Sequence, residues 1–168
     1  MELLLSRLVK KGIRIGATDD ALRIQAGNAT LTDADKQELR NSKPELIDLL
    51  KNRKVACLSY PQERLWFLAQ LGYSRQYHIP SAVRIKGKFN AEALKSVLKL
   101  ITQRHESFRT SFRQIGDLPI QFIEDKIDLN IEEADLSNYN ETEKDAELRR
   151  LLYEFIERPF DLEEAPLI

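Results

Sequence analysis

Cysteine and histidine are scarce in this sequence, which contains one cysteine, Cys57, and two histidines, His78 and His105. A lone cysteine cannot close an intrachain disulfide, and a metal site built on thiolates needs more cysteines than this chain has. A histidine acts as a general base only with a positioned partner, and His105 is better explained as a structural residue at a helix end. We therefore expect neither a metal site nor a catalytic residue in this chain.

Long hydrophobic runs and an excess of charge of one sign are also missing. The longest apolar run near the start, Leu3 to Leu5, is too short for the core of a signal peptide or for a membrane span. The formal net charge of −1 argues against binding to nucleic acid or to an anionic membrane. With 42% hydrophobic and 32% charged residues, the composition is typical of a soluble globular protein, for which a cytoplasmic location is the default.

Residues 1–55 have the pattern of a small α-β-β-α-α unit. Leucines recur at helical spacing over residues 1–11. Residues 13–15 and 22–26 each alternate between apolar and polar side chains on either side of a turn at Asp19-Asp20, which predicts a β-hairpin. The leucines that we expect the first helix to bury are Leu4, Leu5 and Leu8.

Two pairs of residues have the spacing of capping boxes at the starts of the next helices. Thr32 with Asp35 opens the first, and Ser42 with Glu45 opens the second. The second helix is expected to bury Leu46, Ile47, Leu49 and Leu50. Residues 51–54 are basic, which suits a helix C-terminus or a linker, and Cys57 is placed in the connection that follows.

From residue 56 onward the pattern predicts an α+β unit. Ser59 and Gln62 form a capping box at the start of a helix, and Asn90 caps a longer one. Strands are expected at residues 79–85, 108–112, 120–123 and 127–131. A last helix over residues 141–157 is expected to bury Leu148, Leu151, Leu152, Phe155 and Ile156.

Four stretches of this second unit resemble, in order and spacing, the condensation domains of nonribosomal peptide synthetases. Residues 58–68, LSYPQERLWFL, resemble the S-x-x-Q-x-R-L-W signature. Residues 104–112, RHESFRTSF, resemble R-H-E-x-L-R-T-x-F with Phe108 in place of leucine, and residues 77–80 lead into the strand between the two signatures. Residues 158–167 resemble the R-x-F-D-L…P-L segment. The signature residues to which we assign a structural role are Gln62, Arg64, Trp66, Arg104, His105 and Arg109.

The resemblance implies part of a chloramphenicol-acetyltransferase-like α/β sandwich lobe. Such domains join a donor thioester to an acceptor aminoacyl thioester, both held on the phosphopantetheine arms of carrier proteins, so that no cofactor is expected in this chain itself. The family's H-H-x-x-x-D-G motif, which contains the catalytic histidine, does not occur in the sequence. We expect the domain to be truncated before this motif and the chain alone to be inactive. Arg109 would pair with the aspartate of that motif, and without it we expect a solvated cation.

Residues 1–55 resemble the docking domains named after the tubulysin synthetase subunit TubC. The resemblance rests on the leucine-rich first helix, on Gly12-Ile13-Arg14-Ile15, on the second strand and on the Ser42-x-Pro-Glu-Leu helix. It implies recognition of the C-terminal tail of the preceding synthetase subunit, often by a homodimer. An exposed strand edge can bind such a tail, and nearby basic groups would favour an acidic one. The predicted peptide-binding residues are Lys10, Lys11, Arg14, Ile15, Leu22, Arg23, Ile24 and Gln25.

Other interpretations remain open at this point. Arg14 and Arg23 are also consistent with the solvated face of a half-buried hairpin, since scattered surface charge is normal. The whole chain is consistent with an acyltransferase of the same fold that acts on coenzyme A and carries an oligomerisation unit at its start. A pure interaction protein that retains half of the lobe is a third possibility. We prefer a docking module fused to an incomplete condensation domain.

Overall fold

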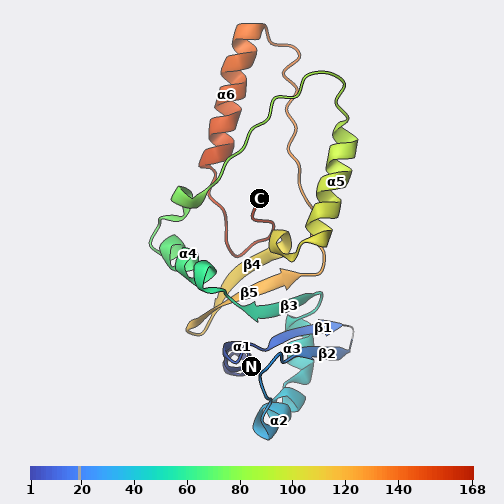
Figure 1. Cartoon of the computed structure of the whole chain (residues 1–168), viewed down its shortest axis with the longest axis vertical. Helices are drawn as coiled ribbons and strands as arrows, with labels where there is room; N and C mark the ends of the chain where they lie inside the picture. Colours follow the sequence, from blue (N-terminus) through green and yellow to red (C-terminus); the bar gives the residue numbers. More distant parts are fainter. Residues whose placement is uncertain (19) are drawn as a thin grey trace.

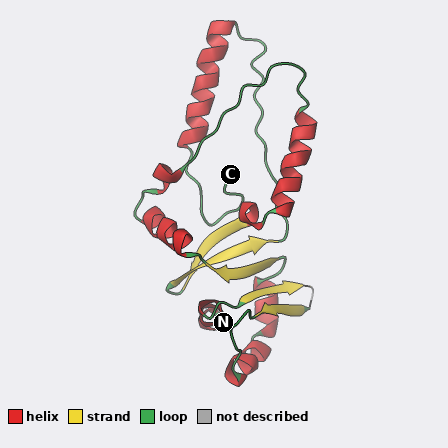
Figure 2. Cartoon of the chain, in the orientation of Figure 1, coloured by secondary structure: helices red, strands yellow, loops and turns green. Residues whose placement is uncertain are grey.

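The computed structural model describes residues 1–18 and 20–168 and contains helices together with an antiparallel sheet (Figures 1 and 2). The helices are α1 (Glu2–Lys10), α2 (Asp33–Asn41), α3 (Lys43–Leu49), α4 (Tyr60–Gln70), α5 (Ala91–Arg104) and α6 (Glu141–Glu157), with the 3-10 turns η1 (Ser74–Tyr77) and η2 (Glu106–Arg109). The strands are β1 (Arg14–Thr18), β2 (Ala21–Gln25), β3 (Arg53–Cys57), β4 (Thr110–Ile115) and β5 (Leu118–Glu124). The predicted α+β class is confirmed.

One five-stranded sheet runs through both halves of the chain in the order β2-β1-β3-β5-β4. The predicted hairpin is present, with β1 and β2 paired from Arg14↔Gln25 to Thr18↔Ala21; of the turn expected at Asp19-Asp20, Asp19 lies outside the described residues. β3 pairs with β1 on one side and with β5 on the other, antiparallel in both cases. Figure 1 shows β3 between the two hairpins, with α1, α2 and α3 on the side of the first one.

Strand β3 is an element that the sequence patterns did not predict. We expected residues 51–54 to be a helix end or linker and placed Cys57 in a connection. Residues 51 and 52 do form a turn after α3, but Arg53, Lys54 and Cys57 belong to the middle strand, so the expectations are wrong for them. Two neighbouring cations conceal the alternation of a strand. They are accommodated because both side chains are half-buried while their charged ends pair with Glu124 and Glu106.

The hydrophobic core lies on one face of this sheet and receives side chains from both halves of the chain. The three leucines predicted for α1 are buried in it, as is Val9, which the pattern missed. The remaining fully buried members come from α3 and its C-cap, from β1, β3 and β5, and from Ile13; they are Leu46, Leu50, Ile13, Ile15, Val55, Ile120 and Phe122. Of the four residues expected from α3, Ile47 and Leu49 are only partly buried. The expected boundary between residues 55 and 56 lies within β3.

The two capping boxes predicted before α2 and α3 have different outcomes. Thr32 caps α2 as predicted: its hydroxyl accepts the Asp35 N–H at 3.2 Å, and the Asp35 carboxylate accepts the Thr32 N–H at 3.0 Å. The box of Ser42 and Glu45 is absent. Ser42 is both the C-cap of α2 and the N-cap of α3. Its backbone (φ −95°, ψ 10°) therefore lacks the extended conformation of an N-cap residue, and its side chain makes no capping bond.

In the second half the helices and the strands expected at 108–112 and 120–123 are confirmed, the two strands pairing as the β4–β5 hairpin, but the other two predicted strands are wrong. Asn90 caps α5 through a 3.0 Å bond from the Ala93 N–H. Residues 79–85 and 127–131 are irregular. In the part of the chain that the structure describes, no strand pairs with either stretch, and a strand without a neighbour has no partner for its backbone groups.

Helix α6 has its predicted bounds but not its predicted burial. None of its residues is buried: Leu148, Leu151, Leu152 and Ile156 are half-buried, and Phe155 is exposed. Figure 1 shows the reason, since α5 and α6 extend away from the sheet with long loops along most of their length, and η1 lies near the end of α6. Among the described residues, no helix combines the length and the apolar character that crossing a bilayer requires.

Gly16 is predicted to be necessary for the pairing of β1 with β3. A Cβ atom on Gly16 would lie 3.0 Å from the Cβ of Lys54 and 3.3 Å from the carbonyl oxygen of Arg53. We expect Gly16→Val to lower the free energy of unfolding by about 1–3 kcal/mol, as overpacking does. Urea denaturation measures this, with Ala21→Val on the exposed outer strand as the control. Equal stability of both variants would contradict the pairing.

A fragment of residues 57–168 is predicted to aggregate. It lacks all but the last residue of β3, so the edge of β5 is uncovered, and Ile120 and Phe122 lose their shared core. Size-exclusion chromatography and urea unfolding of the fragment, with the 168-residue chain as the control, test this expectation. A soluble fragment that unfolds cooperatively would show that β3 is dispensable for this half.

Candidate functional site

The polar face of β1, β2 and β3 carries a groove lined with basic side chains. Arg23, Gly16 and Lys54 lie opposite one another on the three strands, and residues in such register project from the same face of a sheet. Arg14 and Gln25 form a neighbouring pair in this register and line the same groove of about 150 Å³. Because Gly16 has no side chain, the middle of the groove stays open.

The first hairpin has one open edge, on β2. The outer edge of β1 is paired with β3, whereas no described residue pairs with the outer edge of β2 (Figure 1). Side chains alternate along β2: Leu22 and Ile24 are partly buried against the core, and Arg23 and Gln25 are exposed. An extended peptide can therefore add to this sheet beside β2 and find both an apolar and a basic side there.

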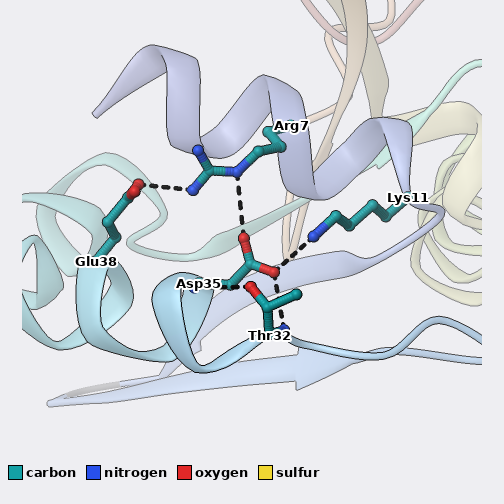
Figure 3. A network of polar contacts seen from close by, with 5 residues as sticks. All are labelled: Arg7, Lys11, Thr32, Asp35 and Glu38. Atoms are coloured by element: carbon teal, nitrogen blue, oxygen red, sulfur yellow. Dashed lines mark hydrogen bonds and ion pairs between the residues drawn. The ribbon is translucent and has the colours of Figure 1, made fainter.

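The two lysines expected near the hairpin have different surroundings. Lys11 binds the Asp35 carboxylate at 2.6 Å, and Asp35, only 2% exposed, also accepts bonds from Arg7 Nε at 3.2 Å and from the Thr32 N–H (Figure 3). The bond from Lys11, followed by those from Thr32, holds the pKa of Asp35 far below its usual range. Both lysines are exposed, and Lys11 joins the end of α1 to α2 through its pair with Asp35.

A carboxylate of the chain already lies beside the basic groove. Glu106 of η2 accepts a hydrogen bond from Lys54 Nζ. This bond, with smaller contributions from the charges of Arg109 and Arg14, lowers the pKa of Glu106. Sequence reasoning missed Gly16, Lys54 and Glu106, because their proximity depends on β3 being a strand.

The residues of the first condensation-like signature lie on α4. Gln62 donates to Gln121 of β5 at 3.2 Å, and Gln121 donates to the Cys57 carbonyl at 2.6 Å, so that this pair ties α4 to the sheet. Trp66 is buried and lines an apolar cavity of about 280 Å³ together with ten other residues, among them Phe112. Arg64 is exposed.

The residues of the second signature lie where α5 meets the sheet. Arg109 is not the solvated cation that we expected. It donates to the carbonyls of Thr102 at 3.2 Å and Gln103 at 3.3 Å, and also to the carbonyl of Glu124, so it connects the end of α5 to β5. The last carbonyls of a helix carry partial negative charge and suit a guanidinium. Arg104 and His105 are exposed, and His105 follows α5 as its C-cap.

The described residues contain no cluster of three or more histidine, cysteine, aspartate or glutamate side chains that could hold a metal ion. The arrangement as a whole offers an open strand edge, a basic groove beside it, and signature residues that bond to the main chain and to one another.

Comparison with known proteins divides the chain just before β3. Residues 52–168 match the family model described as "Condensation domain", and residues 2–52 match the one described as "TubC N-terminal docking domain". One of the proteins of linear gramicidin synthase from Brevibacillus parabrevis is 43% identical over 112 residues, which are 66% of this chain and 1% of that protein. Malpibaldin synthetase of Mortierella alpina is 42% identical over 113 residues, 66% of this chain and 2% of that protein.

A solved structure has a similar fold. The cyclization-docking bidomain of the nonribosomal peptide synthetase EpoB from Sorangium cellulosum superposes with a TM-score of 0.52 at 22% identity, covering 98% of this chain and 36% of that one. At this identity the likeness concerns the fold alone. The chain thus spans a small part of each relative that it matches.

The Asp35 network predicts a pH-dependent stability. Because its pKa is lowered in the folded state, ionised Asp35 stabilises the fold above its unfolded pKa of about 4, and this stabilisation is lost as the pH falls below that value. Asp35→Asn should therefore reduce the unfolding free energy at neutral pH, and its difference from the wild type should shrink as the pH falls below about 4.

Urea denaturation at a series of pH values measures this difference. Asp33→Asn is the matched control, because Asp33 lies on the same helix with its side chain 99% exposed and, among the described residues, pairs with Lys36 alone. We expect that variant to differ little from the wild type at any pH, since exposed ion pairs contribute little. A difference for Asp35→Asn that does not change with pH would contradict the role of its charge.

Proposed function

The chain belongs to the condensation-domain family of nonribosomal peptide synthetases and begins with a TubC-type docking domain, and on this basis we propose that residues 1–55 recognise the C-terminal tail of the preceding synthetase subunit. Residues 56–168 form the first part of the condensation domain in this proposal. The boundary between residues 55 and 56 separates the proposed functions and does not separate two structural units, since the two parts share β3 and a core.

The open edge of β2 is the observation that carries the proposal. An added strand would form main-chain hydrogen bonds with β2, and these bonds give affinity that depends little on sequence. Side chains of the tail that point toward the core side would meet Leu22 and Ile24, and those on the other side would meet Arg23 and Gln25. Arg14 adds charge on the second side, and basic groups of this kind raise the association rate of acidic partners.

We propose different roles for the residues that the sequence predicts to bind the peptide. Arg14, Arg23 and Gln25 line one groove, while Leu22, Ile24 and the fully buried Ile15 belong to the core side of the hairpin. Lys11 is engaged by Asp35 and is not assigned to the tail. Lys10 is exposed and is kept as a peripheral contributor to the positive potential.

A second copy of this chain is a further partner that we propose for the docking domain. Leu3, on the outer side of α1, is 83% exposed, and Met1 beside it is exposed as well. A small domain buries little apolar surface, so it is stabilised when a second copy covers an exposed leucine of this kind. The tail of the preceding synthetase protein and the second copy would then use different surfaces, the β2 edge and α1.

For the whole protein we propose peptide-bond formation between substrates carried on the phosphopantetheine arms of carrier proteins. The synthetases named above support this assignment over an acyltransferase that uses coenzyme A. In this chain the signature residues Gln62 and Arg109 position α4 and α5 against the sheet. The location that fits these partners is the cytoplasm.

Tail recognition is tested by NMR titration of the isotope-labelled 168-residue chain with C-terminal peptides of candidate upstream synthetase proteins. We expect shifts concentrated on residues 13–27. Arg23→Gln should weaken binding about threefold to fivefold, as the loss of one exposed charge pair does. Arg40→Gln, which removes an exposed arginine from the end of α2, should leave binding unchanged.

The salt dependence of binding distinguishes recognition of the tail by charge from addition of the tail as a strand. Binding through charge should weaken as the ionic strength rises. If the affinity changes neither with salt nor in Arg23→Gln, the proposed preference for an acidic tail is wrong, while the addition of the tail as a strand beside β2 still stands. The absence of shifts with every peptide would refute tail recognition by this hairpin.

A further inference from the structure

The groove on the polar face has properties of a carboxylate site in its own right. Its basic side chains come from three strands: Arg23 from β2, Arg14 from β1 and Lys54 from β3. Gly16 forms its floor, where a Cβ atom would lie 3.0 Å from that of Lys54. Arg53 also lines the groove, but its guanidinium pairs with Glu124 at 3.4 Å and adds little net charge.

The chain's own Glu106 shows which chemistry this groove accepts. Its carboxylate binds Lys54, and Arg14 contributes to the positive field that it experiences. Among the described residues neither Arg14 nor Arg23 forms an ion pair. Asp125 lines the groove as well, yet Arg14, Arg23 and Lys54 still outnumber the carboxylates of Glu106 and Asp125. The groove therefore retains an excess of positive charge.

The distance between an added strand and β3 determines which part of a bound tail could place a carboxylate near Lys54. Neighbouring strands lie about 4.8 Å apart, so that a strand added outside β2 would be about 14 Å from β3. Side chains project from the face of a sheet, so a glutamate of the added strand and Lys54 would both have to lie flat and fully extended across β2 and β1 to meet. A carboxylate near Lys54 must therefore belong to a segment that leaves the added strand and crosses the sheet face. The free end of a C-terminal tail can do so, and it ends in a carboxylate.

We propose that the terminal carboxylate of the docked tail binds in this groove over Gly16, between Arg14, Arg23 and Lys54, in competition with Glu106. The inference rests on the proposed function and adds a residue of the condensation-domain match, Lys54, to the docking site. A tail held in this way contacts both halves of the chain through the strand that joins them. Displacement of Glu106 makes docking detectable at η2.

The test uses the 168-residue chain and one upstream C-terminal peptide in two forms, with a free terminal carboxylate and with a terminal carboxamide. We expect the amide to bind about threefold to fivefold more weakly. Lys54→Gln should lower the affinity for the free acid by a similar factor and leave the affinity for the amide unchanged, because the substitution and the amidation remove the same contact. Fluorescence anisotropy gives the affinities, and Lys51→Gln, an exposed lysine that does not line the groove, is the control.

Glu106→Gln provides the opposite change. Removal of the competing carboxylate should raise the affinity for the free-acid peptide about twofold to threefold and leave the affinity for the amide unchanged. Equal binding of acid and amide, or equal effects of Lys54→Gln on both, would overturn the carboxylate site while tail docking through β2 stands. Loss of binding for both forms in the wild-type chain would instead refute the docking function itself.

Discussion

The backbone hydrogen bonds of β3 are the interaction on which this structure depends. A strand that pairs on both sides has its main-chain donors and acceptors satisfied, and here it pairs with the first hairpin and with the second. The same strand places Val55 in the common core and Lys54 on the opposite face. Without β3 the two hairpins would have separate edges and separate, thinner cores.

This pairing also determines where a partner can bind. Because β3 pairs with β1 at Ile15 and Gly16, the full-length edge that the described hairpin leaves for a tail is on β2. The face that remains in solvent collects charge from three strands, with Gly16 as its floor. On the far side of the domain the buried Asp35 holds α1 and α2 together and withdraws Lys11 from the surface charge. Structural and recognition charges are thus separated by the core.

Much of the local structure could be predicted, since it depends on short-range contacts. The α2 cap needs only Thr32 and Asp35, three residues apart, and it forms as expected. Ser42 failed as a cap because the preceding helix had already set its backbone conformation. The strand at 79–85 failed because alternation of side chains does not supply a neighbouring strand. Burial of α6 failed for the same reason, as amphipathic spacing does not specify what lies opposite.

By itself the sequence determined the family, the helices, both hairpins and the basic character of the first hairpin, since motifs and periodicity are properties of neighbouring residues. Only the tertiary structure decided that residues 53–57 form a strand, that Lys54 faces Gly16 and Glu106, and that Arg109 binds carbonyls. These contacts join residues far apart in the chain. They depend on backbone pairing, to which every residue contributes the same N–H and C=O groups, and the order of side chains alone does not reveal it.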